Sequence, residues 1–337
     1  ADPAQVGEST VSSSALQADP AQVGEWGPLI GGFPVPAVHS LLLHTNKILF
    51  FRGDGEDEGG VGDYRTHLLN LDTFEFETTF QMDANIFCSG HSYLPDGRIL
   101  LTGGEKEEDL GPSYVHTFDP ITETWHREPD MRDGRYYPTN TALGDGTTLI
   151  FAGRDPDGGS NPNVERFIPA GGPNGENVIE YFDGSDRAMT WYPRMHLLPD
   201  GKVFRAGQEE DAYTFDPSTG TWQFVAQNNY GERYWGTSVA LPGDQEKIMI
   251  FGGQDRSSTN LATNTAEIID LGDANPQWQF TSPMNFPRMH VNVVLLPDGK
   301  VFVAGGTEDG AESIPVFESE MFDPQTEQWT VLPSQES

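Results

Sequence analysis

The stretch His91-Ser-Tyr-Leu-Pro-Asp-Gly-Arg-Ile-Leu-Leu-Thr-Gly-Gly104 contains two short apolar segments, a tight turn between them and a closing pair of glycines. An Asp-Gly step supplies the positive φ that hairpin turns need, so the pattern predicts a β-hairpin. Similar turns recur along the chain, at Leu143-Gly-Asp-Gly146, Leu198-Pro-Asp-Gly201, Leu241-Pro-Gly-Asp244 and Leu296-Pro-Asp-Gly299. The chain is therefore expected to repeat one hairpin unit.

A second type of hairpin alternates with the first and carries a tryptophan. Its copies include Phe118-Asp-Pro-Ile-Thr-Glu-Thr-Trp125, Phe215-Asp-Pro-Ser-Thr-Gly-Thr-Trp222 and Phe322-Asp-Pro-Gln-Thr-Glu-Gln-Trp329. Two hairpins give a four-stranded unit of about 50 residues, which is typical of the kelch blade of a β-propeller. We expect each tryptophan to pack between adjacent blades and expect very little helix, because no long apolar pattern has the helical period.

The predicted fold class is all-β, a kelch-type β-propeller with six recognisable four-stranded units. Either the ring has six blades, or it is a seven-bladed ring whose closing hairpin is absent from these residues; we favour seven. Residues 1–25 repeat the sequence ADPAQVGE and are expected to form a flexible or docking tail. Residues 26–337 form the propeller, with Trp26-Gly-Pro-Leu-Ile30 as an outer strand of the closing blade.

The charge balance restricts the classes of partner. The chain has 52 acidic and 19 basic residues, a formal net charge of -33. Such a surface argues against binding to nucleic acid or to anionic membranes. No apolar run reaches the length of about 18 residues expected of a membrane-spanning helix. An acidic surface with few lysines favours a secreted protein from a marine or halophilic setting, and an ordinary acidic secreted protein is the alternative.

The only cysteine, Cys88, lies just before the first quoted hairpin, so an internal disulfide is excluded. By itself such a residue is typically a small buried hydrophobe. Cys88 belongs, however, to a series of distinctive segments: Phe87-Cys-Ser-Gly-His91, Met131-Arg-Asp-Gly-Arg-Tyr-Tyr-Pro138, Trp191-Tyr-Pro-Arg-Met-His-Leu-Leu-Pro-Asp-Gly201, Ala266-Glu-Ile-Ile-Asp270 and Phe286-Pro-Arg-Met-His-Val-Asn292. In order and spacing these segments resemble the galactose oxidase and glyoxal oxidase group of copper radical oxidases, especially bacterial members.

The resemblance implies a specific cofactor. Cys88 would be joined by a thioether to Tyr137, which would ligate copper and form the radical. Tyr136 and Tyr137 should alternate in direction along a strand, and the Arg-x-Tyr register selects Tyr137. The family's other copper ligands, a second tyrosine and two histidines, would come from a further hairpin and a C-terminal domain that the 337 residues do not contain. The copper site is therefore expected to be incomplete, and His290 is given no metal role.

Other candidate residues have two readings each. Arg135, like Arg194 and Arg288, would bind an anionic substrate or pair with a carboxylate. His91 would contribute to substrate binding at the channel mouth or be a hydrogen-bonded structural residue. The acidic loops at residues 54–58 and 155–158 would hold calcium through oxygen ligands or be solvated loops.

Two functions follow. In the first, the chain is the propeller of a secreted copper radical oxidase that oxidises a primary alcohol or aldehyde with O2 and releases H2O2. In the second, it is a non-catalytic extracellular propeller that binds carbohydrate or protein or serves structural assembly. In the first case the missing copper ligands would come from a C-terminal piece or from another chain. A second chain or self-assembly is one way in which the ring could be completed.

Overall fold

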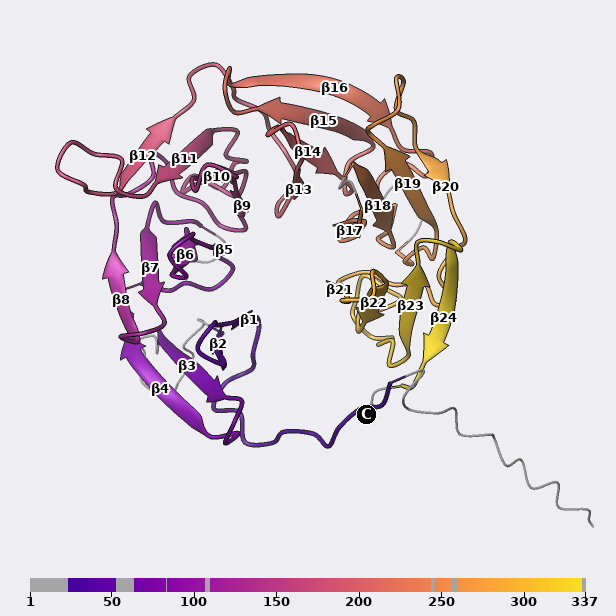
Figure 1. The fold of residues 1–337 in the computed structure, drawn as a ribbon, viewed down its shortest axis with the longest axis horizontal. Coiled ribbons are helices and arrows are strands. Elements are labelled where there is room, and N and C mark those ends of the chain that lie inside the picture. The colour runs from indigo at the N-terminus through magenta and orange to yellow at the C-terminus, as the bar shows by residue number, and fades with distance from the viewer. Residues whose placement is uncertain are drawn as a thin grey trace, which may run out of the picture.

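The computed structural model describes residues 24–52, 64–82, 84–106, 110–243, 246–255 and 260–334. These residues form six four-stranded antiparallel sheets, each connected in simple sequential order. Figure 1 shows the sheets arranged around a common centre, with the first strand of each sheet nearest the centre. The prediction of an all-β propeller with six four-stranded units is confirmed. The described residues contain no helix long and apolar enough to cross a membrane.

The first three blades follow one another along the chain. Blade 1 consists of β1 (His39–Leu42), β2 (Lys47–Phe51), β3 (Arg65–Asn70) and β4 (Phe76–Gln81). Blade 2 consists of β5 (Gly90–Tyr93), β6 (Ile99–Thr102), β7 (Val115–Asp119) and β8 (Thr124–Arg127). Blade 3 consists of β9 (Thr139–Ala142), β10 (Thr148–Phe151), β11 (Val164–Ile168) and β12 (Val178–Tyr181).

The remaining three blades repeat this order. Blade 4 consists of β13 (Arg194–Leu197), β14 (Val203–Ala206), β15 (Asp211–Asp216) and β16 (Thr221–Gln227). Blade 5 consists of β17 (Thr237–Ala240), β18 (Lys247–Phe251), β19 (Ala266–Asp270) and β20 (Gln279–Phe280). Blade 6 consists of β21 (Asn292–Leu295), β22 (Val301–Ala304), β23 (Ser319–Asp323) and β24 (Gln328–Leu332).

The predicted turns and tryptophans are in place. At the turn between β5 and β6, Gly97 has φ +88° and its N–H donates to the carbonyl of Leu94 at 2.9 Å. The Trp125 ring packs on Phe118 and its Nε1 donates to Thr66 Oγ1 of blade 1 at 3.0 Å. Each tryptophan of the second hairpin type therefore joins its own blade to the preceding one or to the loop leading from it, as expected.

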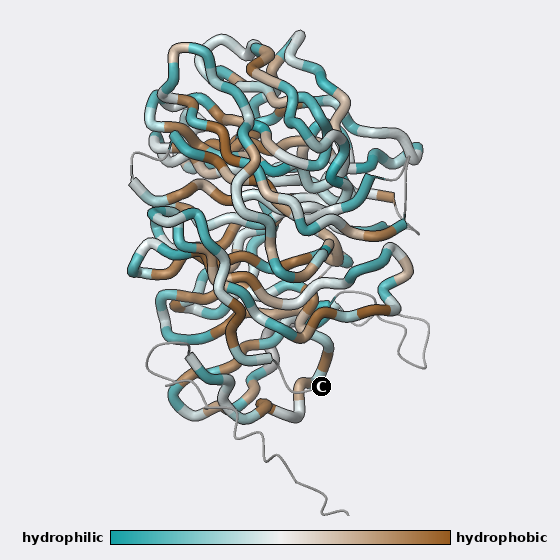
Figure 2. Tube along the Cα trace, turned by 90° about the vertical axis from the view of Figure 1, so that its right-hand side faces the viewer, coloured by the Kyte–Doolittle hydropathy of each residue, from teal (hydrophilic) through white to brown (hydrophobic). Residues whose placement is uncertain are grey.

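The core lies between the sheets. Leu49 and Phe51 of blade 1 pack against Ile99 and Leu101 of blade 2, and all four are almost fully buried. Figure 2 shows the same distribution, with hydrophobic segments inside the stack and hydrophilic loops at its edges. Because the side chains of a strand alternate, each blade presents one apolar face to the blade before it and one to the blade after it.

Residues 24–38 run between blade 6 and blade 1 (Figure 1). Trp26 Nε1 donates to the Pro333 carbonyl at 2.9 Å, and Phe33 packs edge-on against Phe50 and Phe76. The prediction that residues 26–30 form an outer strand is wrong, since residues 24–33 contain no strand. Pro28 lacks the N–H that a ladder needs, and the neighbouring glycines favour irregular backbone.

Two expectations about the chain ends stay predictions. Residues 1–23 lie outside the described residues, so the tail with its repeated sequence has no structural test. The described residues form six blades, and the seventh blade of the favoured ring likewise remains a prediction.

A glycine pair fixes the approach of blade 3 to blade 2. Gly103 has φ +71°, and a Cβ built on it would lie 2.1 Å from the carbonyl oxygen of Arg135. The neighbouring Gly104 N–H donates to that same oxygen at 3.1 Å. These glycines therefore allow the segment that precedes β9 to lie directly against blade 2.

We predict that Gly103→Ala lowers the free energy of unfolding by about 1–3 kcal/mol, because the new methyl group adds a clash to an unfavourable φ. Urea denaturation followed by tryptophan fluorescence measures the change. Gly144→Ala is the matched control, since Gly144 has no atom within 4 Å of its built Cβ. Equal stability of the two variants would contradict the packing argument.

Candidate active site

Five residues occupy the same position at one mouth of the central channel, two residues before the innermost strand of blades 2 to 6. All five have left-handed backbone conformations, with φ between 50° and 62°: Cys88, Tyr137, Tyr192, Trp235 and His290. A positive φ is rare for bulky side chains and persists only where surrounding contacts enforce it. The repetition at one structural position indicates a built feature, which we call the rim.

Hydrogen bonds connect the rim from blade to blade. The Tyr137 N–H donates to the Cys88 carbonyl at 3.0 Å, and the Tyr192 N–H donates to the Tyr137 carbonyl at 2.9 Å. The Gln208 side chain continues the series, donating to Tyr192 O at 2.9 Å and accepting from Trp235 N at 3.4 Å. The His290 N–H then donates to Trp235 O at 3.0 Å.

Blade 1 joins the same series through a histidine. The Cys88 N–H donates to Nε2 of His39, the first residue of β1, at 3.1 Å. The rim is therefore tied to all six described blades, and the side chains that it carries are held by backbone contacts.

The Cys88 thiol lies within hydrogen-bonding reach of the side chains of Tyr137, Tyr136 and Tyr192. Burial raises the pKa of Cys88 to about 11, so the residue is a protonated thiol at neutral pH. The expected placement of Cys88 and Tyr137 in adjacent blades is therefore found, and the two residues are in contact.

Tyr136 and Tyr137 do not alternate in direction as expected. Their ring centroids are 4.2 Å apart, and both side chains reach Cys88. The reason is that Tyr137 has φ +62° and lies before β9 begins, so the alternation of an extended strand does not apply.

Aromatic side chains enclose Tyr137. The Trp191 ring is stacked on it, with centroids 5.5 Å apart and planes 5° apart. Tyr192 lies edge-on at 4.9 Å, and Trp235 lies at 6.0 Å. These rings limit the access of water to the phenol ring of Tyr137.

Sequence reasoning did not identify Trp191 and Trp235 as parts of this site. Trp191 falls in a segment that was singled out, but a tryptophan gives no local signal for stacking on a residue of another blade. Trp235 could have been found by the repeat, because it occupies the position of Cys88 in blade 5.

The structure separates the predicted arginines into two groups. Arg135 is fully buried and its Nη2 lies 2.7 Å from Glu165 Oε2, and Arg288 makes the same bond to Glu320. For these two, pairing with a carboxylate is the reading that the structure supports, so Arg135 is not presented to a ligand. Arg194 has no carboxylate partner among the described residues.

His91 lies in the wall of the central channel, in β5. Its ring lies edge-on to His39 with centroids 5.5 Å apart, and burial lowers its pKa. The substrate-binding role predicted for His91 stays a prediction.

The described residues beside Tyr137 offer three phenol oxygens and one thiol. They do not include a group of three or more His, Cys, Asp or Glu side chains that could hold a metal. Cu(II) favours several nitrogen and oxygen donors in tetragonal geometry. These side chains alone therefore do not fit a complete copper site, and the copper role of Tyr137 stays a prediction.

The calcium prediction concerned two loops. Residues 54–58 lie outside the described residues. In the loop at 155–158, Asp155 Oδ1 accepts the N–H groups of Asp157 at 2.9 Å and Gly159 at 2.8 Å. The carboxylate thus stabilises its own turn, and the calcium role has no support from this geometry.

The fold is an all-β propeller in which a buried cysteine lies against tyrosines at the channel mouth. The family described as glyoxal oxidase N-terminus matches residues 58–332, and the chain belongs to this family. The resemblance to galactose and glyoxal oxidases is confirmed at this level.

Individual relatives agree with this placement. Galactose oxidase of Gibberella zeae is 26% identical and covers 93% of the chain. The aldehyde oxidase GLOX of Vitis pseudoreticulata is 28% identical and covers 81% of it. The chain spans about half the length of these relatives, 49% and 54%.

A solved structure has the same fold. It is described as a novel fungal alcohol oxidase of the AA5 family in complex with copper, and it superimposes with a TM-score of 0.78 at 23% identity. The match covers 93% of this chain and 68% of the oxidase.

The channel histidines predict a pH dependence of stability. Burial, together with the nearby His91, lowers the pKa of His39 to about 3, and burial beside Arg194 lowers that of His196 to about 4. Below about pH 6.5 the unfolded chain binds protons at both residues and the folded chain does not. Stability that is present above this pH is therefore lost as the pH falls.

The free energy of unfolding should therefore fall as the pH falls from about 6.5 to 5. We predict that His39→Gln and His196→Gln each make this fall less steep, by up to about 1.4 kcal/mol per pH unit. Urea denaturation at a series of pH values measures it. A slope unchanged from the wild type in both variants would show that these histidines are not held neutral by the fold.

Proposed function

We propose that this chain is the propeller of a copper radical oxidase that converts a primary alcohol or an aldehyde with O2 and releases H2O2. The observation that carries the proposal is the contact between the Cys88 thiol and Tyr137 at the rim. Membership of the glyoxal oxidase family supports it, as do relatives named galactose oxidase and aldehyde oxidase. A purely structural or carbohydrate-binding propeller is not favoured by these relatives.

The proposed cofactor is a thioether between Cys88 and Tyr137. Forming it replaces the thiol S–H and one ring C–H of the tyrosine with a C–S bond. Two protons and two electrons leave, and O2 takes them up as H2O2. The product is a phenol ring that is easier to oxidise by one electron, and stacking on Trp191 shields that ring.

Copper belongs to this proposal with Tyr137 as one ligand. When bound beside Tyr137, copper would supply a one-electron acceptor. The described residues beside Tyr137 do not supply the other atoms that would bind copper. The proposed copper site is therefore incomplete within the described part of the chain.

The proposed substrates are small alcohols, aldehydes or carbohydrates that carry a primary alcohol. Secretion, and a saline habitat consistent with the net charge of -33, remain parts of the proposal.

We predict that the natural full-length protein, expressed with copper, releases H2O2 with primary alcohols or with glyoxal-type aldehydes. Tyr137→Phe removes the phenol oxygen and should abolish release, and Cys88→Ser should reduce it by at least about tenfold, or about 1.4 kcal/mol in barrier. A peroxidase-coupled assay measures the rate, and metal analysis measures the copper content.

Tyr234→Phe provides a control, because it removes a phenol oxygen from a ring that packs on Trp235, with centroids 5.0 Å apart, in another blade than Cys88 and Tyr137. It should retain activity. A copper-loaded wild type that releases no H2O2 with any of these substrates, or a Tyr137→Phe variant of undiminished activity, would rule out the proposed function.

A further inference from the structure

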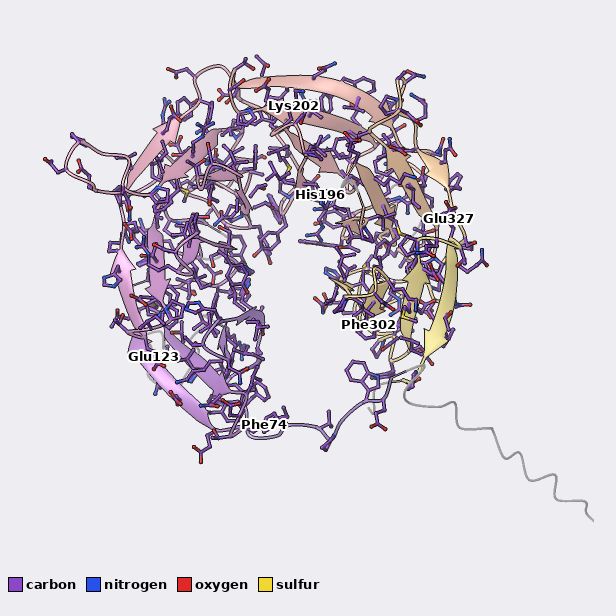
Figure 3. The ribbon with its side chains drawn as sticks, viewed as in Figure 1. Phe74, Glu123, His196, Lys202, Phe302 and Glu327 are labelled. Atoms are coloured by element: carbon purple, nitrogen blue, oxygen red, sulfur yellow. The ribbon has the colours of Figure 1, made fainter. Side chains whose placement is uncertain are left out.

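The central channel holds a cavity of about 510 Å³ directly behind the rim. Its wall includes Ser89 and Pro138, the residues that follow Cys88 and Tyr137. The innermost strands supply the rest, including His91, Arg194 and His196, and Figure 3 shows His196 at the inner edge of the ring. None of the lining residues is Asp or Glu, although the chain contains 52 acidic residues.

Arg194 brings a positive charge to this cavity. Its Nε and Nη2 both donate to the Gly236 carbonyl at 3.1 Å, which leaves Nη1 and the second hydrogen of Nη2 available. By contrast, three fully buried arginines, Arg135, Arg233 and Arg288, each contact a glutamate at 2.7 Å. Among the described residues, no carboxylate neutralises Arg194.

Two donor atoms of residues that line the cavity have no hydrogen-bond partner. The hydroxyl of Ser89, a residue that is 0% exposed, has no hydrogen bond. The amide nitrogen of Asn140 has none either, although its Oδ1 accepts a bond from Thr102 at 2.6 Å. Both atoms have less than 1 Å² of accessible surface, so neither faces the cavity, and Arg194 is the group that a ligand there would contact.

The neighbouring histidines add donors without adding charge. Burial is the main cause that lowers the pKa values of His39, His91 and His196, so all three are neutral near pH 7. The cavity wall therefore carries one net positive charge, from Arg194, which a single negative charge would balance.

We propose that this channel cavity binds a small monocarboxylate. A planar carboxylate accepts two parallel bonds from the free end of a guanidinium, which a spherical chloride does not. A sulfate dianion would carry a second negative charge that the single guanidinium does not balance. The site requires neither copper nor the thioether, and it goes beyond the proposed oxidase function.

The test titrates the metal-free protein with acetate at constant ionic strength, by isothermal calorimetry, with acetamide as the neutral isostere. We expect acetate to bind and acetamide not to bind measurably. Arg194→Gln should weaken acetate binding at least about tenfold, since it removes the charge. Asn140→Asp should abolish binding because it adds a negative charge while keeping an acceptor for Thr102.

Arg98→Gln is the matched control, since Arg98 lies in a surface turn beside Asp96, and it should leave acetate binding unchanged. Circular dichroism establishes that each variant is folded, and Asn140→Asp decides the matter if Arg194→Gln does not fold. Absence of acetate binding, equal binding of acetamide, equal binding of chloride or sulfate, or undiminished binding by folded Asn140→Asp would each overturn the proposal.

Discussion

The chain of hydrogen bonds along the rim is the constraint on which the site depends. It runs from His39 to His290 through main-chain groups and the Gln208 side chain, and touches every described blade. It holds bulky residues at positive φ, a conformation that they would not adopt alone. Because the Tyr137 N–H is bonded to the Cys88 carbonyl, the two side chains start from adjacent backbone positions. The proposed cofactor pair is thus a consequence of how neighbouring blades meet.

Buried ion pairs stabilise the loops that lead to the rim. In blades 3, 5 and 6 an arginine close before the innermost strand bonds a glutamate on the third strand, with both side chains fully buried. Each glutamate also accepts a backbone N–H from the loop that leads to its arginine. Breaking one partner of such a pair typically costs about 3–5 kcal/mol, because the other charge stays buried. The pairs therefore fix the entry loops. Arg194 does not belong to this series, because it is the first residue of β13, where blade 4 has Thr190 at the position of the paired arginines.

Local patterns predicted the fold well, and contacts between blades explain what they missed. Asp-Gly turns such as that at Gly97 depend on a few adjacent residues, so the hairpins, the blades and the tryptophan packing followed from the sequence. The strand expected at Trp26 failed because its backbone bonds depend on a partner that the sequence does not name. The direction of Tyr136 and the stacking of Trp191 on Tyr137 depend on the rim, which joins residues of different blades. The proximity of Cys88 to Tyr137 came from a family resemblance, and the copper ligands have no test in the described residues.

Peptide mapping of the protein after exposure to copper and O2 tests the pairing of Cys88 with Tyr137 most directly. The expected result is one cross-linked peptide that contains both residues and is lighter than its two parts by two hydrogen atoms. Fragmentation should place the bond on Tyr137 rather than on Tyr136, although both rings reach the thiol. Recovery of two separate peptides with Cys88 fully alkylated, or a bond placed on Tyr136, would contradict this assignment.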